Sequence, residues 1–298
     1  MKRSISVILP NYNGRHLLEK NLPSLFEALD DLEHEIIVID DNSPDDSVQF
    51  LENSYPDIKI IKSEINSGFS ATCNKGIHAA QLDLLCIVNT DVTFTPDYFT
   101  KLLPEFDDPD LFAVKGDIIN YKKSVDDAIN TDRTTLVYYK RGFLRFDTKH
   151  PLTSRTLISG DDTQLVFLGC CFVCDRKMML QLDGFDEIYS PFYWEDADLA
   201  QRALKRGFKL LYLPESSVYH QASSTIGNYR SYTLRRLVSN RNKFLFSWRH
   251  LDTGKLWFSH APITLFNLLF RWLVLDWKYY AAFFWALARK LRFSWKIA

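Results

Sequence analysis

Short apolar runs alternate, in the first part of the chain, with segments whose apolar residues recur every three or four positions. The runs have the length and β-branched content of buried strands, and the spacing of the other segments predicts helices. The predicted strands are 4–9, 35–39, 58–62 and 84–88, and the predicted helices are 16–29, 44–55 and 69–80. Repeated strand–helix alternation predicts right-handed crossovers, and therefore an α/β fold with a mostly parallel sheet flanked by helices.

Polar residues follow three of these predicted strands, in the segments 10–14, 40–43 and 89–91. In open α/β sheets, ligands bind in the crevice beyond the carboxyl ends of the strands. At that edge the carboxylate of Asp91 could hold Mg²⁺ or Mn²⁺ against a diphosphate. The alternative is that Asp91 caps a helix that begins near Thr95.

The common phosphate-binding motifs are missing from the sequence. A dehydrogenase would carry a Gly-rich turn after its first strand, and a kinase-type nucleotide site would carry a Lys after its glycines. Neither pattern occurs here. We therefore expect the phosphates of any nucleotide to be met by a metal ion and by side chains.

A group of acidic residues opens a later predicted helix that ends before Gly207. These residues are Glu195, Asp196 and Asp198. The helix dipole favours acidic residues in the first turn, so capping of the helix is the simple explanation. Three carboxylates beside two aromatic residues, Tyr193 and Trp194, are more than a cap needs.

Residues 119–163 are polar and irregular, and this pattern predicts an insertion. It could be a flap over the site or a solvated loop with no role. A strand is predicted after it, at 165–174. Cys171 and Cys174 in that strand have zinc-like spacing, but no second pair matches them. The five cysteines lie mostly in apolar stretches, which fits reduced thiols in a cytosolic protein.

Charge is distributed unevenly along the chain. Residues 1–200 hold 19 Lys/Arg and 34 Asp/Glu, whereas residues 201–298 hold 17 Lys/Arg and 3 Asp/Glu. We therefore expect the C-terminal part to face something anionic, either a membrane surface or a phosphorylated substrate. No nucleic acid partner is expected, because the sequence has no helix-turn-helix, zinc-finger or RNA-binding signature. The chain enters its first strand within a few residues, which predicts that there is no signal peptide.

The C-terminal region is both aromatic and basic. Six of the seven Trp lie between Trp248 and Trp295, and the apolar stretch 262–275 is short for a membrane span. On a helical projection of residues 260–296, the polar side chains gather near one line: His260, Asn267, Arg271, Lys278, Arg289, Arg292 and Lys296. This pattern predicts a helix lying in a membrane interface through residues 257–298. The alternative is a helix packed on the rest of the chain or on a partner subunit.

Seven short motifs, in this order, are similar to those of the family-2 glycosyltransferases of the GT-A fold. The chain most resembles the rhamnosyl- and galactofuranosyltransferase-like branch, over roughly residues 4–225. The motifs are Val7-Ile8-Leu9-Pro10-Asn11-Tyr12-Asn13, Val38-Ile39-Asp40-Asp41-Asn42-Ser43, Asn66-Ser67-Gly68-Phe69 with Asn74-Lys75-Gly76, Asn89-Thr90-Asp91, Gly184-Phe185-Asp186-Glu187, Glu195-Asp196-Ala197-Asp198-Leu199 with Arg202, and Val218-Tyr219-His220.

The resemblance implies roles for individual residues. Asp91 would ligate the divalent cation, with His220 as second ligand unless it is an ordinary strand-end histidine. Asp196 would be the catalytic base, with Glu195 beside it to bind or orient the acceptor. The family's motif begins with Asp where this chain has Asn89, so we expect weaker metal binding. The nucleotide sugar would be bound by Pro10, Tyr12, Asp41, Asn66, Gly68, Asn74, Asn89 and Thr90, with the first three at the base and ribose.

The resemblance also implies the whole organisation. A GT-A-type, Rossmann-like catalytic domain over residues 1–228 would be followed by a helical, membrane-associating region over 229–298. We expect an inverting transfer from a UDP- or dTDP-sugar to a lipid-linked or polysaccharide acceptor, at the cytoplasmic face of the cell membrane. A double-displacement enzyme would need a further carboxylate nucleophile. The alternatives are a nucleotidyltransferase on a similar sheet and a catalytically inactive membrane-bound scaffold.

Overall fold

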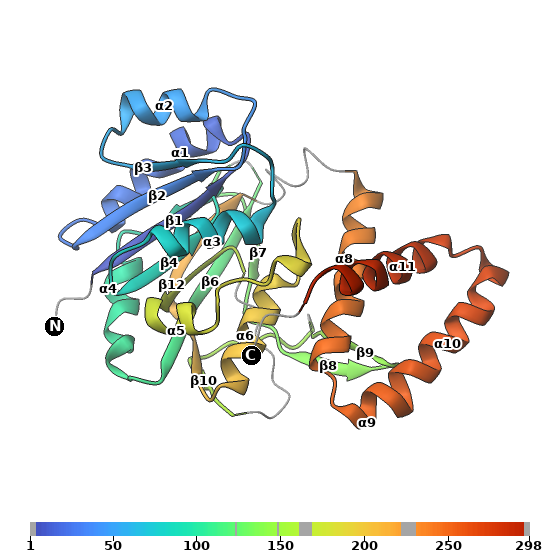
Figure 1. The fold of residues 1–298 in the computed structure, drawn as a ribbon. Helices are drawn as coiled ribbons and strands as arrows, with labels where there is room; N and C mark the ends of the chain where they lie inside the picture. Colours follow the sequence, from blue (N-terminus) through green and yellow to red (C-terminus); the bar gives the residue numbers. More distant parts are fainter. Residues whose placement is uncertain (1–3, 123, 148, 161–168, 222–230, 295–298) are drawn as a thin grey trace.

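The computed structural model describes residues 4–122, 124–147, 149–160, 169–221 and 231–294 (Figure 1). Its first elements are β1 (Ile5–Asn11), α1 (Arg15–Ala28), β2 (His34–Asp40), α2 (Ser47–Ser54), β3 (Lys59–Lys62), α3 (Phe69–Ala79) and β4 (Leu84–Val88). Their bounds lie within two residues of the predicted ones, except that α2 begins at Ser47 rather than near Pro44. Asp45 accepts a hydrogen bond from the backbone N–H of Ser47 at 3.2 Å. This turn delays the start of the helix.

The middle of the chain completes one ten-stranded sheet within the described residues, in the order β10-β12-β6-β11-β4-β1-β2-β3, with β5 on β12 and β7 on β6. Strands β3, β2, β1 and β4 are parallel, as predicted, whereas β11 is antiparallel to both β4 and β6. The elements here are β5 (Val92–Phe94), α4 (Tyr98–Leu102), η1 (Leu103–Asp107), β6 (Leu111–Tyr121), β7 (Ala128–Asp132), β8 (Val137–Lys140), β9 (Phe143–Phe146), β10 (Thr156–Ile158), β11 (Cys171–Asp175), α5 (Arg176–Gln181), η2 (Glu187–Tyr189), α6 (Glu195–Lys205) and β12 (Lys209–Gln221).

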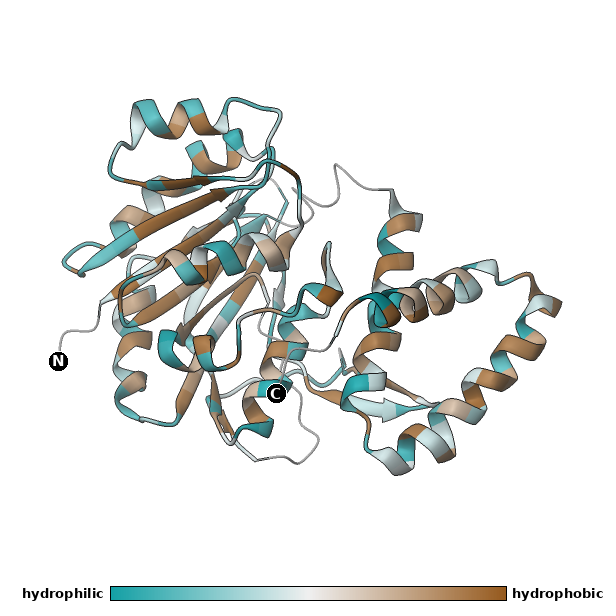
Figure 2. Ribbon diagram, viewed as in Figure 1, coloured by the Kyte–Doolittle hydropathy of each residue, from teal (hydrophilic) through white to brown (hydrophobic). Residues whose placement is uncertain are grey.

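Helices cover both faces of the sheet, which gives three layers (Figures 1 and 2). Successive residues of the central strands point to opposite faces and enter separate cores. In β4, Cys86 packs in the core that contains Leu22 of α1, while Ile87 packs in the core that contains Ile77 of α3. All five residues of β4 are buried. The prediction that 84–88 is a strand buried on both faces is therefore confirmed.

The structure corrects two predictions for the middle of the chain. The described residues of 119–163 form regular strands: β6 runs on to Tyr121, β7 pairs with it, β8 and β9 form a hairpin, and β10 pairs with β12. These strands are short and partly exposed, so they carry little hydrophobic periodicity. Of the strand predicted at 165–174, residues 165–168 lie outside the described part, and β11 covers Cys171–Asp175.

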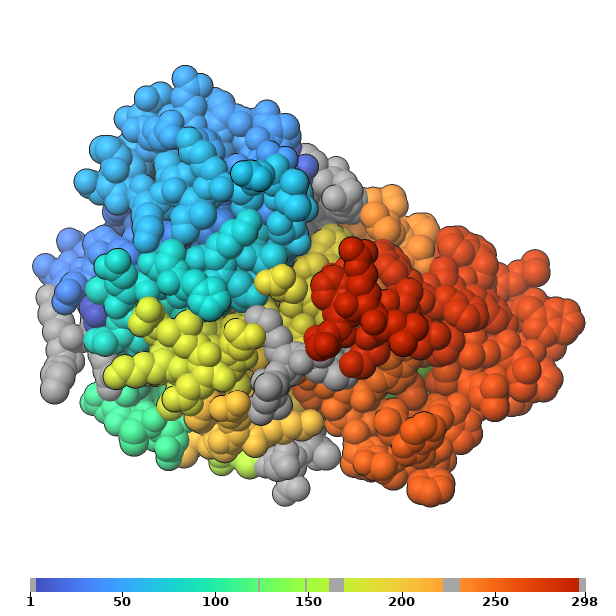
Figure 3. Space-filling model, viewed as in Figure 1, coloured from blue at the N-terminus to red at the C-terminus, as the bar shows by residue number. Residues whose placement is uncertain are grey.

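The C-terminal region is a set of helices: α8 (Tyr232–His250), α9 (Thr253–Lys255), η3 (Leu256–His260), α10 (Ala261–Phe270), η4 (Arg271–Val274) and α11 (Trp277–Arg292). The single helix expected over 260–296 is broken after η4, where Leu275 has a left-handed φ of 51°. A third core joins α8 and α11 to Trp194 and Ala197 at the start of α6. These helices form a lobe that lies against the rest of the protein (Figure 3). Within residues 257–298, α11 therefore packs on the rest of the chain through one face, as the alternative predicts.

Candidate active site

The polar ends of β1 and β2 meet at one edge of the sheet, as the sequence predicts. Asn11 and Asp40 are partners in the parallel register of the two strands. The side-chain amide of Asn11 donates to Asp40 Oδ1 at 2.8 Å and to Ser43 Oγ at 3.2 Å. These contacts link the residues that follow β1 to those that follow β2, and they form one wall of the edge.

Asp41 fixes the start of α3 at this edge. Its buried carboxylate accepts hydrogen bonds from the backbone N–H groups of Ser67 and Gly68, both at 2.9 Å. Gly68 has a φ of +86°, and a Cβ at this position would lie 2.8 Å from the Cα of Pro191. Only glycine fits here without displacing the Pro191 loop. The structure thus gives Asp41 and Gly68 a positioning role, and their contact with a nucleotide remains a prediction.

Asn74 lies farther along α3 and faces the turn before η2. Its side-chain amide donates to the carbonyl of Phe185 and to Glu187 Oε1, both at 3.0 Å, and its Oδ1 accepts from the Phe185 N–H at 2.9 Å. The contacts of Asn74 therefore hold this turn and lend no support to the predicted donor-binding role. Asn66, just before α3, is exposed.

The other predicted donor-binding residues lie at the same edge as Asp41. Pro10 is the last-but-one residue of β1, and Tyr12 follows that strand. Asn89 and Thr90 follow β4, and the carbonyl of buried Thr90 accepts from Asn21 of α1 at 2.9 Å. These positions are compatible with binding of a nucleotide, which remains a prediction for each of them.

Asp91 is held beside His220 by the pairing of β5 with β12. His220 faces Val92 in that antiparallel register, and the N–H of Gln221 donates to the Asp91 carbonyl at 3.0 Å. Asp91 Oδ1 consequently lies 3.4 Å from His220 Nε2. Because β5 separates Asp91 from α4, which begins at Tyr98, the alternative that Asp91 caps the following helix is wrong.

This pair suits a divalent cation. His220 Nδ1 lies 2.7 Å from Asn120 Oδ1, and since an amide oxygen only accepts, Nδ1 carries the proton. The lone pair of Nε2 then faces the Asp91 carboxylate, and a positive charge between the two groups would stabilise this arrangement. A proton can supply it: burial alone would lower the pKa of His220, but the Asp91 carboxylate raises it above its usual value. A metal ion bound by one carboxylate oxygen and one imidazole nitrogen can supply it as well.

Two protein ligands would leave most of the coordination sphere to other groups. Among the described residues, no cluster of three or more His, Cys, Asp or Glu side chains could hold a metal ion. Oxygen atoms of a bound diphosphate and water would therefore complete the coordination of a cation at Asp91 and His220.

Asp196 lies at the same edge, across the segment that precedes β11. Its Oδ2 accepts from the N–H of Gly169 at 3.0 Å, and its Oδ1 accepts from the N–H of Ala197 at 2.8 Å. The carbonyl of Cys170, the next residue after Gly169, accepts from the N–H of Asn89 at 3.0 Å. Residues 169–170 thus connect Asp196 to the motif that contains Asp91.

The two carboxylates at the start of α6 titrate near neutral pH. Burial, and then the charge of Asp196, raises the pKa of Glu195 to about 8. Burial raises the pKa of Asp196 to about 6, while the N–H groups of Gly169 and Ala197 and the charge of Lys115 oppose the rise. Glu195 Oε2 has no hydrogen-bond partner among the described residues. At pH 7 a protonated Glu195 could donate a hydrogen bond, and an ionised Asp196 could accept a proton.

Asp198, the third carboxylate, is committed to structure. It is fully buried and accepts from Arg202 Nε at 2.8 Å and from the Tyr189 hydroxyl at 3.0 Å, and it lies 2.8 Å from His250 Nε2. Burial alone would raise the pKa of Asp198, but Arg202 and His250 hold it well below its usual range. Asp198 therefore anchors α6 to α8 and stays ionised.

Two residues of α8 clasp the loop that leads into α6. Arg241 and Asn242 are fully buried, and together they donate to four backbone carbonyls of the loop 189–193. Arg241 bonds Tyr189 at 3.0 Å and Ser190 at 2.6 Å, and Asn242 bonds Tyr189 at 2.7 Å, Phe192 at 3.0 Å and Tyr193 at 2.8 Å. Neither residue stands out in the sequence, where the pair is only a polar dipeptide before the apolar run 244–246.

The clasped loop has an uncommon backbone conformation. Tyr193 and Trp194 both have positive φ, of 75° and 77°. Left-handed backbone in bulky residues is unfavourable and persists only where the surroundings impose it. Arg241 and Asn242 impose it here, and the turn sets the direction from which Glu195 and Asp196 enter the site.

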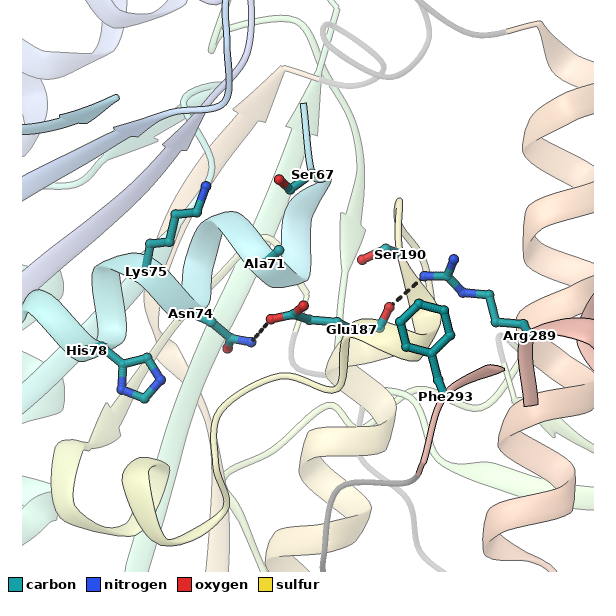
Figure 4. A pocket seen from close by; sticks show the side chains of 9 residues that line it. All are labelled: Ser67, Ala71, Asn74, Lys75, His78, Glu187, Ser190, Arg289 and Phe293. Atoms are coloured by element: carbon teal, nitrogen blue, oxygen red, sulfur yellow. Dashed lines mark hydrogen bonds between the residues drawn. The ribbon is translucent and has the colours of Figure 1, made fainter. Parts of the chain in front are cut away.

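A pocket of about 460 Å³ adjoins the clasped loop (Figure 4). None of Asp91, Asp196 and His220 lines it. It opens between α3, η2 and the end of α11, and basic side chains line it from both α3 and α11. Its lining residues are Ser67, Ala71, Asn74, Lys75, His78, Glu187, Ser190, Arg289 and Phe293.

Comparison with known proteins gives consistent matches. The family model described as Glycosyl transferase family 2 matches residues 6–179. O-antigen chain rhamnosyltransferase WbaN of Salmonella anatum is 26% identical over 74% of this chain and 67% of its own length. An N-acetylglucosaminyl-diphospho-decaprenol L-rhamnosyltransferase of Mycobacterium tuberculosis is 24% identical over 75% and 78%. A dolichol-phosphate mannosyltransferase of Pyrococcus furiosus is 34% identical over 33% of this chain, but the match spans only 29% of that enzyme.

Solved structures show the same GT-A fold. Mannosyltransferase PcManGT from Pyrobaculum calidifontis, in complex with GDP-Man and Mn²⁺, matches with a TM-score of 0.57 at 16% identity, over 99% of this chain and 77% of its own. Residues 1–349 of S. aureus TarS in complex with UDP-GlcNAc match with a TM-score of 0.59 at 15% identity, over 88% and 69%.

Proposed function

This chain belongs to glycosyl transferase family 2, and we propose that it transfers a sugar from a nucleoside-diphosphate donor to a lipid-linked or polysaccharide acceptor in cell-surface glycan synthesis. The two rhamnosyltransferases among its relatives support this substrate class. Solved neighbours with bound UDP-GlcNAc and GDP-Man support a nucleotide-sugar donor. The proposed donor nucleotide is UDP or dTDP.

The proposed reaction is a single displacement with inversion. The acceptor hydroxyl oxygen forms a bond to the anomeric carbon while the bond from that carbon to the diphosphate oxygen breaks. Asp196 takes the hydroxyl proton, and the nucleoside diphosphate leaves. The observation that carries this assignment is that Asp196 is buried at the sheet edge, is linked through residues 169–170 to the Asp91 motif, and has a pKa of about 6. A base with such a pKa is ionised at neutral pH but still accepts a proton readily.

Asp91 and His220 would hold Mg²⁺ or Mn²⁺ in this proposal. When bound, such an ion neutralises the negative charge that develops on the leaving diphosphate. The Mn²⁺ in the PcManGT complex supports a divalent cation. Asn89 stands where the family's motif has Asp, and it can still donate a hydrogen bond to phosphate or ribose. Because it brings no charge, we expect the affinity for the metal to be lower than with Asp.

Asp196→Asn tests the assignment of the base. We expect turnover to fall about 100-fold or more, which corresponds to about 3 kcal/mol of barrier. An amide can accept from only one of the Gly169 and Ala197 N–H groups, so donor binding and melting temperature must be measured alongside. Turnover is followed as nucleoside diphosphate released from UDP-, dTDP- and GDP-sugars, with a lipid diphosphate or water as acceptor. Asp57→Asn, the same change on an exposed residue, is the control.

Two outcomes would contradict the proposal. If folded Asp196→Asn keeps more than about a tenth of wild-type turnover, Asp196 is not the base, since general-base catalysis is worth at least about 100-fold. Turnover of Glu195→Gln, measured in parallel, then shows whether Glu195 is the catalytic base instead. If the wild type releases no nucleoside diphosphate from these donors but releases pyrophosphate from a nucleoside triphosphate and a sugar 1-phosphate, the enzyme is a nucleotidyltransferase.

A further inference from the structure

Exposed hydrophobic side chains are concentrated in the C-terminal lobe. Of the twenty-one large exposed ones among the described residues, fifteen lie between Trp257 and Leu291. They cover η3, α10, η4 and one face of α11, where Figure 2 shows hydrophobic residues along the outer helices. Phe258 and Leu275 are 87% and 84% exposed. Monomeric soluble proteins rarely expose apolar patches of more than a few hundred Å², and larger ones mark interaction surfaces.

Two polar side chains of the same helices, those of His260 and Arg289, form hydrogen bonds with the rest of the protein. His260 is buried, accepts from Trp248 Nε1 at 2.9 Å, and its Nδ1 lies 2.6 Å from the Gly142 carbonyl. Arg289 donates to two backbone carbonyls of η2, both at 2.8 Å. These two residues of the polar line predicted from the sequence therefore bind other parts of the same chain. The apolar faces are left outside, which is the reverse of a helix on the surface of a globular protein.

The apolar surface is widest at the turn between α10 and α11. Trp272, Leu273, Val274 and Leu275 follow one another there and are 62%, 61%, 73% and 84% exposed. The turn projects at the edge of the lobe (Figure 1). We propose that this apolar edge, from Trp257 to Leu291, inserts into the interfacial layer of an anionic membrane. A bilayer accepts projecting aromatic and aliphatic side chains without a complementary groove.

Charge favours a membrane over a second copy of the chain. Residues 255–292 hold six Lys/Arg and only one Asp, and Arg292 and Lys255, at the two ends of this stretch, are exposed. Two copies paired through this face would bring like charges together, whereas each cation near anionic lipid is favourable. The aromatic rings suit the membrane–water interface. No helix among the described residues is long and apolar enough to cross a membrane, so we assign the edge to the surface layer.

This proposal does not depend on the proposed sugar transfer. The membrane contact is measured by binding to vesicles, and the transfer is measured by release of nucleoside diphosphate, so either can fail while the other holds. If both hold, α8 connects them, because it packs against α11 and its Arg241 and Asn242 clasp the loop before Asp196. Docking would then set the height of the active site above the membrane.

Flotation of the full chain with lipid vesicles tests the proposal. The vesicles contain phosphatidylcholine alone or mixed with phosphatidylglycerol. We expect the wild type to float with the anionic vesicles and to bind them less well at high salt. Phe266→Gln, Leu273→Gln and Val274→Gln, made together, should weaken this binding at least tenfold without changing the melting temperature, because all three side chains are more than 60% exposed. The control triple variant carries the same change at exposed Val125, Ile129 and Leu157 and should float like the wild type.

The alternatives give different results. If the wild type does not float with either vesicle, the proposal is wrong. It is also wrong if the triple variant of Phe266, Leu273 and Val274 floats as well as the wild type. Light scattering, which measures the mass of the protein in solution, tests the main alternative, that this edge forms a dimer. If the wild type does not bind vesicles and is a dimer, while the triple variant is a monomer, a second copy of the chain covers this edge.

Discussion

Replacing Asn242 with alanine removes the amide that holds the loop before Asp196. In the wild type this amide donates to the carbonyls of Tyr189, Phe192 and Tyr193. Tyr189 keeps a partner in the variant, because Arg241 also donates to it. The carbonyls of Phe192 and Tyr193 lose this donor. At about 1–3 kcal/mol for each unsatisfied buried group, the native loop becomes less favourable by about 2–6 kcal/mol.

The strain in the loop adds to this effect. The left-handed backbone of Tyr193 and Trp194 stores about 1–3 kcal/mol at each residue, which the loop can release once the amide is gone. Every 1.4 kcal/mol that favours a relaxed loop reduces the population of the productive one about tenfold. The lower end of the range for the two carbonyls, about 2 kcal/mol, already corresponds to about 30-fold, so we expect the turnover of Asn242→Ala to fall at least about tenfold. The loss should appear mainly in kcat, because Asn242 holds Phe192 and Tyr193, the residues that lead directly to Glu195 and Asp196.

The assay is steady-state release of nucleoside diphosphate at a temperature well below the melting transition, with the donor concentration varied. A KM for donor that stays within about threefold, with a much lower kcat, would show that the clasp positions the catalytic group. Asn240→Ala is the control, since Asn240 is exposed on the same helix. If Asn242→Ala melts earlier but the folded fraction turns over as fast as the control, the clasp only stabilises the fold, and the reasoning fails.

Two further predictions concern charge in the site. Turnover should rise with pH through about 6 and level off above it, because Asp196 accepts a proton only when ionised and burial raises its pKa to about 6. A turnover that is constant from acidic to neutral pH would exclude Asp196 as the base. Excess EDTA should weaken donor binding, measured as the thermal shift caused by the donor, and Asp91→Ala should weaken it equally, because the cation links the Asp91–His220 pair to the diphosphate. If donor binding is unchanged in EDTA, no metal ion lies between Asp91 and His220, and a proton on His220 supplies the positive charge there.

The first half of the fold is predictable because its two periodicities are strong and local. The run Leu84–Val88 is long enough for one strand, and the helical segments between strands carry clear apolar stripes. Once the strands are parallel, their carboxyl ends must share an edge, which brings the Asp41 and Asp91 segments together without knowledge of any contact. The strands β7 to β10 were missed because short, half-exposed strands carry no such contrast.

The C-terminal helices show the limit of a helical projection. The projection groups His260, Arg271 and Arg289 on one line, but it cannot tell which side of that line meets protein. Here His260 reaches the Gly142 carbonyl and Arg289 reaches η2, so hydrogen bonds to distant segments pull the polar side inward. The contacts are made by residues about a hundred positions apart in the chain. No local pattern in the sequence encodes that proximity.

Contacts between distant parts of the chain also show how far the unit that holds Glu195 and Asp196 extends. All the motifs lie before residue 225, which suggests a boundary near 228, yet the start of α6 depends on residues beyond it. Arg249 and His250 bind Asp198, Asn242 holds the preceding loop, and Arg289 holds η2. Trp194 and Ala197 share their core with α8 and α11. The boundary therefore marks where the motifs end and not where a folding unit ends, because the C-terminal helices complete the wall that holds Asp196 in place.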